Sequence, residues 1–255
     1  MQIIRYSHKR SDPQYGWIHE NLVGLLSEPP FGAYRRLEAM IPLEEVKLLA
    51  PVQPSKIIAI GRNYPEHAKE HDVEIPEVPM IFLKPPSAVI GPGSHIILPP
   101  QSAQVEHESE LGIVISRKGR WIEQEAVKDY ILGCTIVNDV TARDLQRRDG
   151  QWSRAKGFDT FCPVGPWIET DLDPSDILIT CRVNNEIRQM SSTREMVFNI
   201  SQLIIYISSV MTLEPGDLIL TGTPAGVGTL KDGDSVEVEI EGIGKLSNPV
   251  KEEKK

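Results

Sequence analysis

The chain has 255 residues, of which 40% are hydrophobic and 25% charged, and its formal net charge is -9. This length and composition predict a soluble globular protein with one large domain, or a main domain with a small appendage, and argue against disorder. The negative net charge argues against binding to nucleic acid or to an anionic membrane.

The cysteines Cys134, Cys162 and Cys181 are widely spaced and form no C-x-x-C pair. They argue against a disulfide framework or a thiolate metal site, and they fit a reducing compartment. The first residues lack the long apolar core of a signal peptide, and no run of about 18 apolar residues predicts a membrane span. We therefore expect a cytoplasmic protein.

Residues 1–53 are expected to form a small N-terminal module. Its short apolar stretches predict strands, and residues 43–49 predict a polar helix. Pro51 and Pro54 then interrupt the chain, because proline removes a backbone donor and restricts the residue before it. A module of this size buries little surface alone, so we expect it to lean on the main body.

The main domain, residues 54–250, is rich in short apolar runs that predict strands. These runs are residues 56–61, 80–84, 111–115, 133–137, 178–183, 186–190, 217–221 and 234–240. Asn184 and Asn185 predict a hairpin turn, because asparagine tolerates a positive φ. The expected helices are residues 123–130, 141–148 and 200–211. The predicted fold class is therefore α+β, mainly β, with a charged tail at residues 251–255.

An acidic segment leads into the apolar run at residues 111–115. Glu106, Glu108 and Glu110 alternate along it and would share one face of an extended strand. The side-chain origins of Glu108 and Glu110 would then be about 6–7 Å apart. Like charges on one face need a cation to neutralise them, and a hard divalent metal ion is the natural candidate. A solvent-exposed acidic strand face is the alternative.

Asp139 is the candidate third ligand, because it follows the apolar run at residues 133–137 and precedes a predicted helix. Three carboxylates that leave positions open for water and substrate suit Mg²⁺ or Mn²⁺ better than Zn²⁺. Spacing alone does not decide whether Glu106 also belongs to the site.

Pro65 is typical of the first turn of a helix that would carry His67 and Glu70 on one side. A carboxylate beside an imidazole raises its basicity and fixes its tautomer, as a general base requires. The segment also fits the H-x-x-E-H pattern of zinc peptidases, whose helix would have to extend through His71. A polar surface helix is a third interpretation.

Lys156 lies before a glycine and two aromatic residues and is a candidate to contact an anionic substrate or to polarise a carbonyl oxygen. Residues 222–228 predict a turn that presents the Thr223 hydroxyl and backbone N–H groups to a carboxylate. This turn lacks the lysine and helix of a P-loop. A solvated lysine and a plain tight turn are the alternatives. The chain contains no G-x-S-x-G sequence, the pattern that would indicate a serine nucleophile.

Taken in order, these segments resemble the fumarylacetoacetate hydrolase superfamily over about residues 56–250. The matching segments are residues 61–64, 82–85, 108–110, 138–144, 156–159 and 220–224. The resemblance implies a mixed β-sandwich roll with a small N-terminal module, a homodimer and a bound Mg²⁺ or Mn²⁺ ion.

The same resemblance implies roles for individual residues. By position, the metal ligands are Glu108, Glu110 and Asp139. His67 and Glu70 match a pair that activates water on a lid segment, and Lys156 matches the lysine beside the metal. The positions that match substrate contacts are Arg143, Gln146 and Thr223.

The implied activity is that of an enzyme acting on 2-oxo or 2-hydroxy-dienoate acids in the catabolism of aromatic compounds. Acylpyruvate-type C–C bond hydrolysis is the leading expectation. Isomerisation of 2-hydroxyhepta-2,4-diene-1,7-dioate (or 5-carboxymethyl-2-hydroxymuconate) and oxaloacetate-type decarboxylation are alternatives on the same site, because each passes through a stabilised enolate. A non-catalytic protein that binds a metal and a 2-oxo acid is the alternative of a different class. The presence of His67, Glu70 and Lys156 argues against it.

Overall fold

Strands are the main regular structure of the chain and form three sheets, in a computed structural model that describes residues 1–9 and 11–254. The twelve-stranded sheet contains, in order, β4 (Arg36–Pro42), β3 (Leu22–Leu26), β2 (Gln14–His19), β1 (Gln2–His8), β14 (Cys162–Glu169), β12 (Ile131–Asn138), β11 (Ser109–Ile115), β17 (Leu218–Leu220), β6 (Ile57–Gly61) and β7 (Met80–Lys84). Two further strands join it at the side, β5 (Val46–Leu49) beside β1 and β8 (Val89–Ile90) beside β14. The predicted class, α+β and mainly β, is confirmed.

Two smaller sheets complete the main body. The five-stranded sheet has the order β16 (Glu186–Ser192), β15 (Leu178–Val183), β19 (Ser235–Ile240), β20 (Gly244–Glu252) and β9 (Ile96–Leu98). The three-stranded sheet has the order β13 (Thr141–Ala142), β10 (Val105–His107) and β18 (Gly228–Thr229). The pairs β14–β8, β17–β6 and β20–β9 are parallel and the other pairs antiparallel, so the architecture is mixed.

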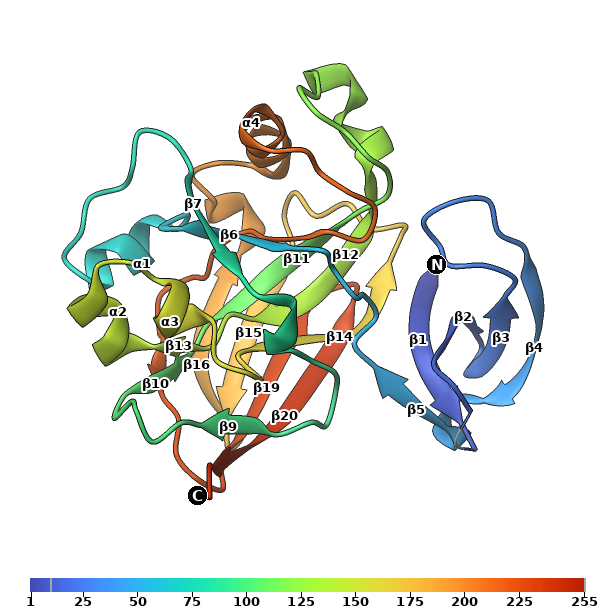
Figure 1. Cartoon of the computed structure of the whole chain (residues 1–255), viewed down its shortest axis with the longest axis horizontal. Helices are drawn as coiled ribbons and strands as arrows, with labels where there is room; N and C mark the ends of the chain where they lie inside the picture. The colour runs from blue at the N-terminus through green and yellow to red at the C-terminus, as the bar shows by residue number, and fades with distance from the viewer. Residues whose placement is uncertain (10, 255) are drawn as a thin grey trace.

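The helices are short and lie at the edges of the sheets. The α-helices are α1 (Pro65–Glu70), α2 (Arg143–Asp149), α3 (Ser153–Lys156) and α4 (Ile200–Val210). The 3₁₀ helices are η1 (Leu43–Glu45), η2 (Pro86–Ala88), η3 (Gln124–Tyr130) and η4 (Thr193–Glu195). Figure 1 shows α1, α2 and α3 grouped at one side of the body, with α4 at another. No helix in the described ranges is both long and apolar enough to cross a membrane.

The central strands of the large sheet are buried on both faces. Ile219 of β17 belongs to the core that the large sheet shares with the five-stranded sheet and α4, whereas Leu218 and Leu220 belong to the core on the opposite face. Ile58 and Ala59 of β6 divide between the two cores in the same way. This alternation follows from the two-residue period of a strand. It explains why these strands are apolar throughout in the sequence.

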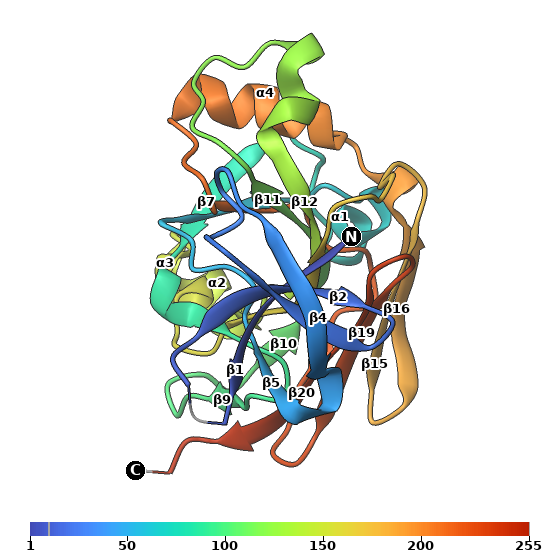
Figure 2. The same ribbon diagram turned by 90° about the vertical axis from the view of Figure 1, so that its right-hand side faces the viewer.

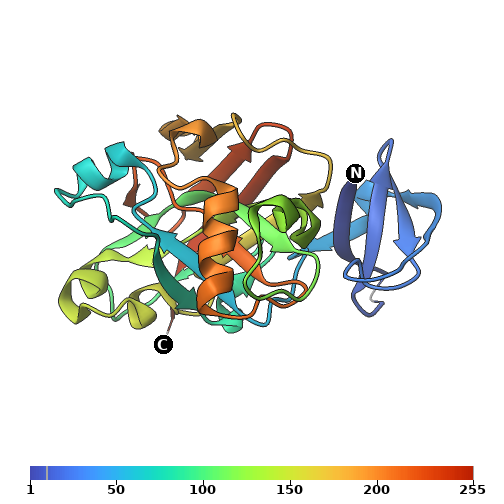
Figure 3. The ribbon, with the colours of Figure 1, turned by 90° about the horizontal axis from the view of Figure 1, so that it is seen from above.

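The N-terminal strands form a lobe at one end of the large sheet, drawn in blue in Figures 1 and 3. Strand β1 pairs with β14, so that Ile3 lies opposite Ile168, and both side chains are buried in one core. Figure 2 views the molecule from this side, with β1, β2 and β4 in front of the body. The lobe therefore leans on the main body through a shared sheet and a shared core.

Three predicted helices differ from the structure. The prediction of a helix at residues 43–49 is wrong. The 3₁₀ helix η1 ends at Glu45, and β5 follows from Val46 to Leu49, paired with β1. This ladder satisfies the backbone of β5 within the sheet, which outweighs local helical preference. The helix expected at residues 141–148 begins two residues later, after β13, and residues 124–130 form a 3₁₀ helix.

The acidic segment is not one continuous strand. Strand β10 ends at His107 and β11 begins at Ser109, so Glu108 lies between strands of two different sheets. Strand β10 pairs with β13 and β18, whereas β11 pairs with β12 and β17. The expectation of a single strand face for Glu106, Glu108 and Glu110 is therefore wrong, because the chain changes sheets at Glu108.

Candidate active site

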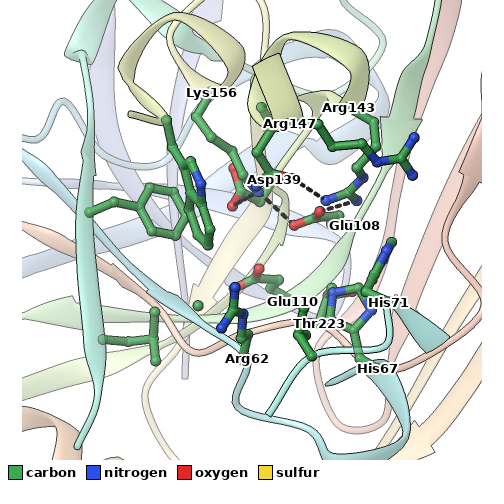
Figure 4. A pocket seen from close by; sticks show the side chains of 16 residues that line it. Arg62, His67, His71, Glu108, Glu110, Asp139, Arg143, Arg147, Lys156 and Thr223 are labelled. Carbon is green, nitrogen blue, oxygen red and sulfur yellow. Dashed lines mark hydrogen bonds and ion pairs between the residues drawn. The ribbon is translucent and has the colours of Figure 1, made fainter. Parts of the chain in front are cut away.

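A cavity of about 210 Å³ opens between helices α1, α2 and α3 and the ends of strands β6, β7 and β11. Figure 4 shows its polar side chains. The residues that line it are Ile60, Gly61, Arg62, His67, His71, Val73, Phe82, Glu108, Glu110, Asp139, Arg143, Gln146, Arg147, Trp152, Lys156 and Thr223. Eight of the nine site residues predicted from the sequence belong to this set, and the ninth, Glu70, contacts His67.

Three buried carboxylates meet at the base of the cavity. Glu108, Glu110 and Asp139 each offer a carboxylate oxygen, and these oxygen atoms all lie within 4.8 Å of one another. The backbone holds two of them in place: the Asp139 N–H donates to the Glu108 carbonyl at 2.8 Å, and the Glu108 N–H donates to Asn138 Oδ1 at 2.9 Å. The end of β12 and the break between β10 and β11 therefore position the site.

Two buried lysines contact these carboxylates. Lys156 Nζ donates to Glu108 Oε2 at 2.7 Å and to Asp139 Oδ2 at 2.6 Å. Lys84 Nζ donates to the other Asp139 oxygen at 2.5 Å. We predicted no role for Lys84 from the sequence. The feature that could have indicated one is its position at the end of an apolar run, within a segment that matches the family.

Arg143 connects the acidic segment to α2. Its Nε donates to Glu106 at 2.7 Å, its Nη2 to Glu108 at 2.5 Å and its Nη1 to Gln146 at 2.7 Å. Glu106 is thus held by Arg143, and it does not belong to the three-carboxylate group of the described residues. Arg143 and Gln146, the expected substrate contacts, line the cavity while bonded to each other.

The electrostatics differ between the two glutamates of the cluster. Burial alone would raise the pKa of Glu108, but the charges of Lys156 and Arg143 outweigh it and hold the pKa well below its ordinary range. Burial, reinforced by repulsion from Asp139 and Glu108, raises the pKa of Glu110 well above its ordinary value. Glu110 accepts a hydrogen bond from the Gly222 N–H at 2.6 Å, but no ion pair joins it to a cation among the described residues.

The lack of a cationic partner for Glu110, in contrast to Glu108, fits a divalent metal ion at this cluster. All three donors are carboxylate oxygens, the donor type that Mg²⁺ and Mn²⁺ prefer. Glu110 is a buried acid without an ion-pair partner among the described residues, and a nearby cation would stabilise its ionised form. The residues present therefore suit the ion.

His67 lies on the opposite side of the cavity from Lys156 (Figure 4). His67 Nδ1 lies 3.3 Å from Glu70 Oε2. The Gly226 N–H, from the glycine-rich turn, donates to both Glu70 oxygens at 3.1 and 3.2 Å. Burial opposes ionisation of Glu70, but its hydrogen bonds to His67 and Gly226 lower its pKa below the ordinary value. Glu70 is therefore a fixed carboxylate that orients the imidazole.

The glycine-rich turn binds carboxylates of the protein itself, through the N–H groups of Gly222 and Gly226. The Thr223 hydroxyl donates to the Ser109 carbonyl at 2.9 Å and accepts from Gln189 Nε2 at 2.8 Å. Its proton is thus already used, so a substrate contact would rely on the remaining lone pair of the hydroxyl oxygen.

The family assignment rests on both sequence and structure. The family profile described as fumarylacetoacetate (FAA) hydrolase C-terminal matches residues 56–251, and a profile described as Rv2993c-like, N-terminal, matches residues 1–51. The chain belongs to the fumarylacetoacetate hydrolase family. The resemblance inferred from the sequence segments is confirmed.

Two solved structures and one relative illustrate the membership. The 5-carboxymethyl-2-hydroxymuconate delta-isomerase from Mycobacterium smegmatis is 47% identical, with a TM-score of 0.93 over 99% of this chain and 100% of that chain. The 2-hydroxyhepta-2,4-diene-1,7-dioate isomerase from Mycobacterium marinum is 44% identical, with a TM-score of 0.92 over 100% of both chains. The mitochondrial oxaloacetate tautomerase Fahd2a of Rattus norvegicus is 46% identical over 233 residues, which are 86% of this chain and 74% of that protein.

These comparisons confirm the expected fold of the fumarylacetoacetate hydrolase type. The chain is an enzyme of this family, and the relatives named above are isomerases and a tautomerase.

Proposed function

We propose that the protein is a divalent-metal-dependent isomerase that moves a proton within 2-oxo or 2-hydroxy-dienoate acids. The supporting observation is that one cavity places three buried carboxylates and Lys156 opposite the His67–Glu70 pair. A cation site and a base on opposite sides of a small cavity suit an acid that forms an enolate between them.

Glu108, Glu110 and Asp139 would hold the metal ion. When bound, Mg²⁺ or Mn²⁺ supplies Lewis-acid stabilisation of negative charge on the substrate's oxygen atoms. Lys156 adds a second positive charge. Burial works against its ammonium group, but the charges of Asp139 and Glu108 raise its pKa, so it stays protonated at neutral pH.

His67 would act as the proton carrier. Its Nδ1–H donates to the Glu70 carboxylate, which leaves the Nε2 lone pair to accept a proton. In an isomerisation, His67 Nε2 takes a proton from a carbon next to the 2-oxo group and returns it to another carbon of the conjugated chain. The negative charge of Glu70 stabilises the imidazolium formed between these two steps.

Two arginines support a substrate with a second acidic group. Arg62 and Arg147 line the cavity, and neither forms an ion pair with a carboxylate within the described part of the chain. Arg62 also has a φ of 61°, an uncommon conformation for a residue with a side chain. Their guanidinium groups would bind the distal carboxylate of a dicarboxylic acid.

Acylpyruvate-type C–C bond hydrolysis in the catabolism of aromatic compounds is the second candidate function. It is favoured by the His67–Glu70 pair, because a base fixed by a carboxylate also activates water to attack a carbonyl. Decarboxylation of oxaloacetate would use the same enolate. A homodimer remains part of the proposal, to be tested by light scattering of the purified protein.

Nuclear magnetic resonance in D₂O with Mg²⁺ or Mn²⁺ would distinguish these reactions. The substrates are oxaloacetate, 2-hydroxyhepta-2,4-diene-1,7-dioate and an acylpyruvate. We expect deuterium incorporation and keto–enol interconversion without C–C cleavage, lost in EDTA. Cleavage of the acylpyruvate alone would favour hydrolysis, and absence of turnover on all three substrates would contradict the enzyme proposal.

A variant pair would test the base. His67→Asn is expected to lower kcat by about 100-fold or more, in line with the usual contribution of general acid–base catalysis. The matched control His95→Asn removes an exposed imidazole outside the cavity and is expected to leave kcat unchanged.

A further inference from the structure

A second group of metal-binding side chains lies at the end of α1, apart from the three carboxylates. His67, Glu70 and His71 each offer one ligand atom, and these atoms lie within 4.8 Å of one another. The proposed reaction uses His67 and Glu70 as a base and its orienting carboxylate, but it gives no role to His71. The H-x-x-E-H pattern is therefore only partly explained by that reaction.

His71 carries an unpartnered nitrogen. Its Nε2 is buried and has no hydrogen-bond partner among the described residues. A buried polar atom without a partner is costly, and each such atom calls for an explanation. The His71 ring lies edge-on to the His67 ring, with centroids 4.7 Å apart and an interplanar angle of 82°. Figure 4 shows the two rings together on one wall of the cavity.

The geometry does not match a zinc peptidase. Helix α1 ends at Glu70 and His71 is its C-cap, so the two histidines do not lie on one continuous helix. Glu70 is itself one of the three clustered donors, whereas in the peptidase pattern the glutamate is a general base. The donors instead form a set of two imidazoles and one carboxylate.

We propose that His67, Glu70 and His71 form a second metal site that takes Zn²⁺, or another divalent ion that prefers imidazole, and that this ion inhibits the enzyme. Three protein ligands with a fourth position for water are a common arrangement for zinc. The oxygen-only cluster of Glu108, Glu110 and Asp139 prefers Mg²⁺ or Mn²⁺, so the two sites differ in donor chemistry.

Zinc binding requires little movement of the donors and a shift of one proton. Zinc–nitrogen and zinc–oxygen bonds of about 2.0–2.2 Å place the donors of a tetrahedral site about 3.4 Å apart. His67 Nδ1 and Glu70 Oε2 are already 3.3 Å apart, and all three donor atoms lie within 4.8 Å of one another. His71 lies beyond the last residue of α1, where the backbone can adjust. The metal takes the Nδ1 lone pair of the neutral imidazole, so the proton that His67 Nδ1 shares with Glu70 moves to Nε2. Nε2 then carries a proton and can no longer accept one.

The proposed zinc site and the proposed base share His67 and Glu70. A neutral imidazole is the form that binds metal, and a metal-bound imidazole is no longer free to accept a proton. The inhibitory consequence rests on the proposed function, because zinc would occupy His67 and Glu70 and remove the base.

The test is a titration of Co²⁺, a coloured substitute for zinc, into the full-length protein saturated with Mg²⁺ and without substrate. We expect one Co²⁺ per chain with the intense visible absorption of a four-coordinate site that contains nitrogen, and calorimetry with Zn²⁺ should give the same stoichiometry. Absence of nitrogen-bound Co²⁺ in the unmodified protein would overturn the proposal. This readout does not depend on whether the proposed reaction occurs.

A pair of variants assigns the ligands. His71→Phe keeps the ring but removes its nitrogens, and it should weaken Zn²⁺ binding by about 10-fold or more. His95→Phe removes an exposed histidine elsewhere and should bind Zn²⁺ as the unmodified protein does. Equal Zn²⁺ affinity of His71→Phe and the unmodified protein would contradict the site. Inhibition is measured for each protein as its own ratio of rates with and without Zn²⁺, and this ratio should move towards one in His71→Phe.

Discussion

The side-chain oxygen of Gln189 accepts hydrogen bonds from both the backbone N–H and the hydroxyl of Ser109, at 3.1 and 3.0 Å. The amide nitrogen of Gln189 donates to Thr223 at 2.8 Å and to the carbonyl of Pro224 at 2.7 Å. One fully buried side chain from β16 therefore joins β11 to the turn after β17. Ser109 stands between Glu108 and Glu110, so this connection supports the carboxylate cluster.

Replacement of Gln189 by leucine should destabilise the protein by about 3 kcal/mol or more, because it leaves several buried donors and acceptors without partners. Denaturant unfolding of the metal-free protein measures this change in the free energy of unfolding. Gln101→Leu, at an exposed position, is the matched control and should stay within about 0.5 kcal/mol. A Gln189→Leu variant as stable as the control would contradict the connecting role.

Glu108 and Glu106 should differ in their effect on metal binding. Glu108→Gln removes a carboxylate of the three-membered cluster and should weaken Mn²⁺ binding by about 100-fold or more, beyond the usual effect of losing an outer-shell partner. Glu106→Gln changes a partner of Arg143 and Gln104 outside the three-carboxylate cluster and should retain Mn²⁺ binding within about 10-fold. Electron paramagnetic resonance of Mn²⁺ measures both affinities. Unchanged Mn²⁺ affinity in Glu108→Gln would refute the ligand assignment.

Glu110 should reduce the stability of the metal-free protein at neutral pH. Burial and the charges of Asp139 and Glu108 raise its folded-state pKa above the ordinary value of 4.5. The folded state then binds more protons than the unfolded state, so stability falls as pH rises from about 4.5 through the raised pKa. Glu110→Gln should therefore be more stable than the unmodified protein at pH 7.5.

The advantage of Glu110→Gln should disappear below about pH 4.5, where Glu110 is protonated in both states. Saturating Mn²⁺ should reverse the order at pH 7.5, because the ion stabilises only the protein that retains its ligand. Urea unfolding at both pH values, with EDTA or Mn²⁺, provides the comparison. A Glu110→Gln variant less stable than the unmodified protein in EDTA at pH 7.5 would be inconsistent with the raised pKa.

Arg62 should determine affinity for a second acidic group. Arg62→Met removes a guanidinium from the cavity wall and should raise KM for a dicarboxylic substrate by about 10- to 100-fold, the usual range for one lost charge-assisted hydrogen bond. The KM for a monocarboxylic acylpyruvate should change little. Steady-state kinetics on both substrates measure this difference, and equal changes in KM would show that Arg62 does not select the distal carboxylate.

Local patterns were sufficient for much of the fold. The β15–β16 hairpin follows from Asn184 and Asn185, which adopt the expected positive φ of 52° and 68°. The apolar runs of β6, β11 and β17 are buried on both faces of the large sheet, as continuous apolar strands are. These features depend on residues that are close in the sequence, so local sequence patterns predict them.

Competition between elements caused the errors. Residues 43–49 carry a helical pattern, but pairing of β5 with β1 decides their conformation. Likewise, the alternating glutamates predict one strand, but the partners of β10 and β11 belong to different sheets. In both cases the backbone hydrogen bonds come from strands that are distant in the sequence, and a local sequence pattern does not identify those strands.

The sequence by itself determined the family, the main strands and the residues that form the candidate site. Only the tertiary structure decided their partners. Lys84 reaches Asp139 across 55 positions, and Gln189 reaches Ser109 across 80 positions. Gln189 lies between the exposed residues Arg188 and Met190, so hydrophobic alternation cannot reveal that it is the buried one. Such contacts depend on how the sheets pack against each other. Packing buries these polar groups, and a buried polar group without a hydrogen-bond partner is costly.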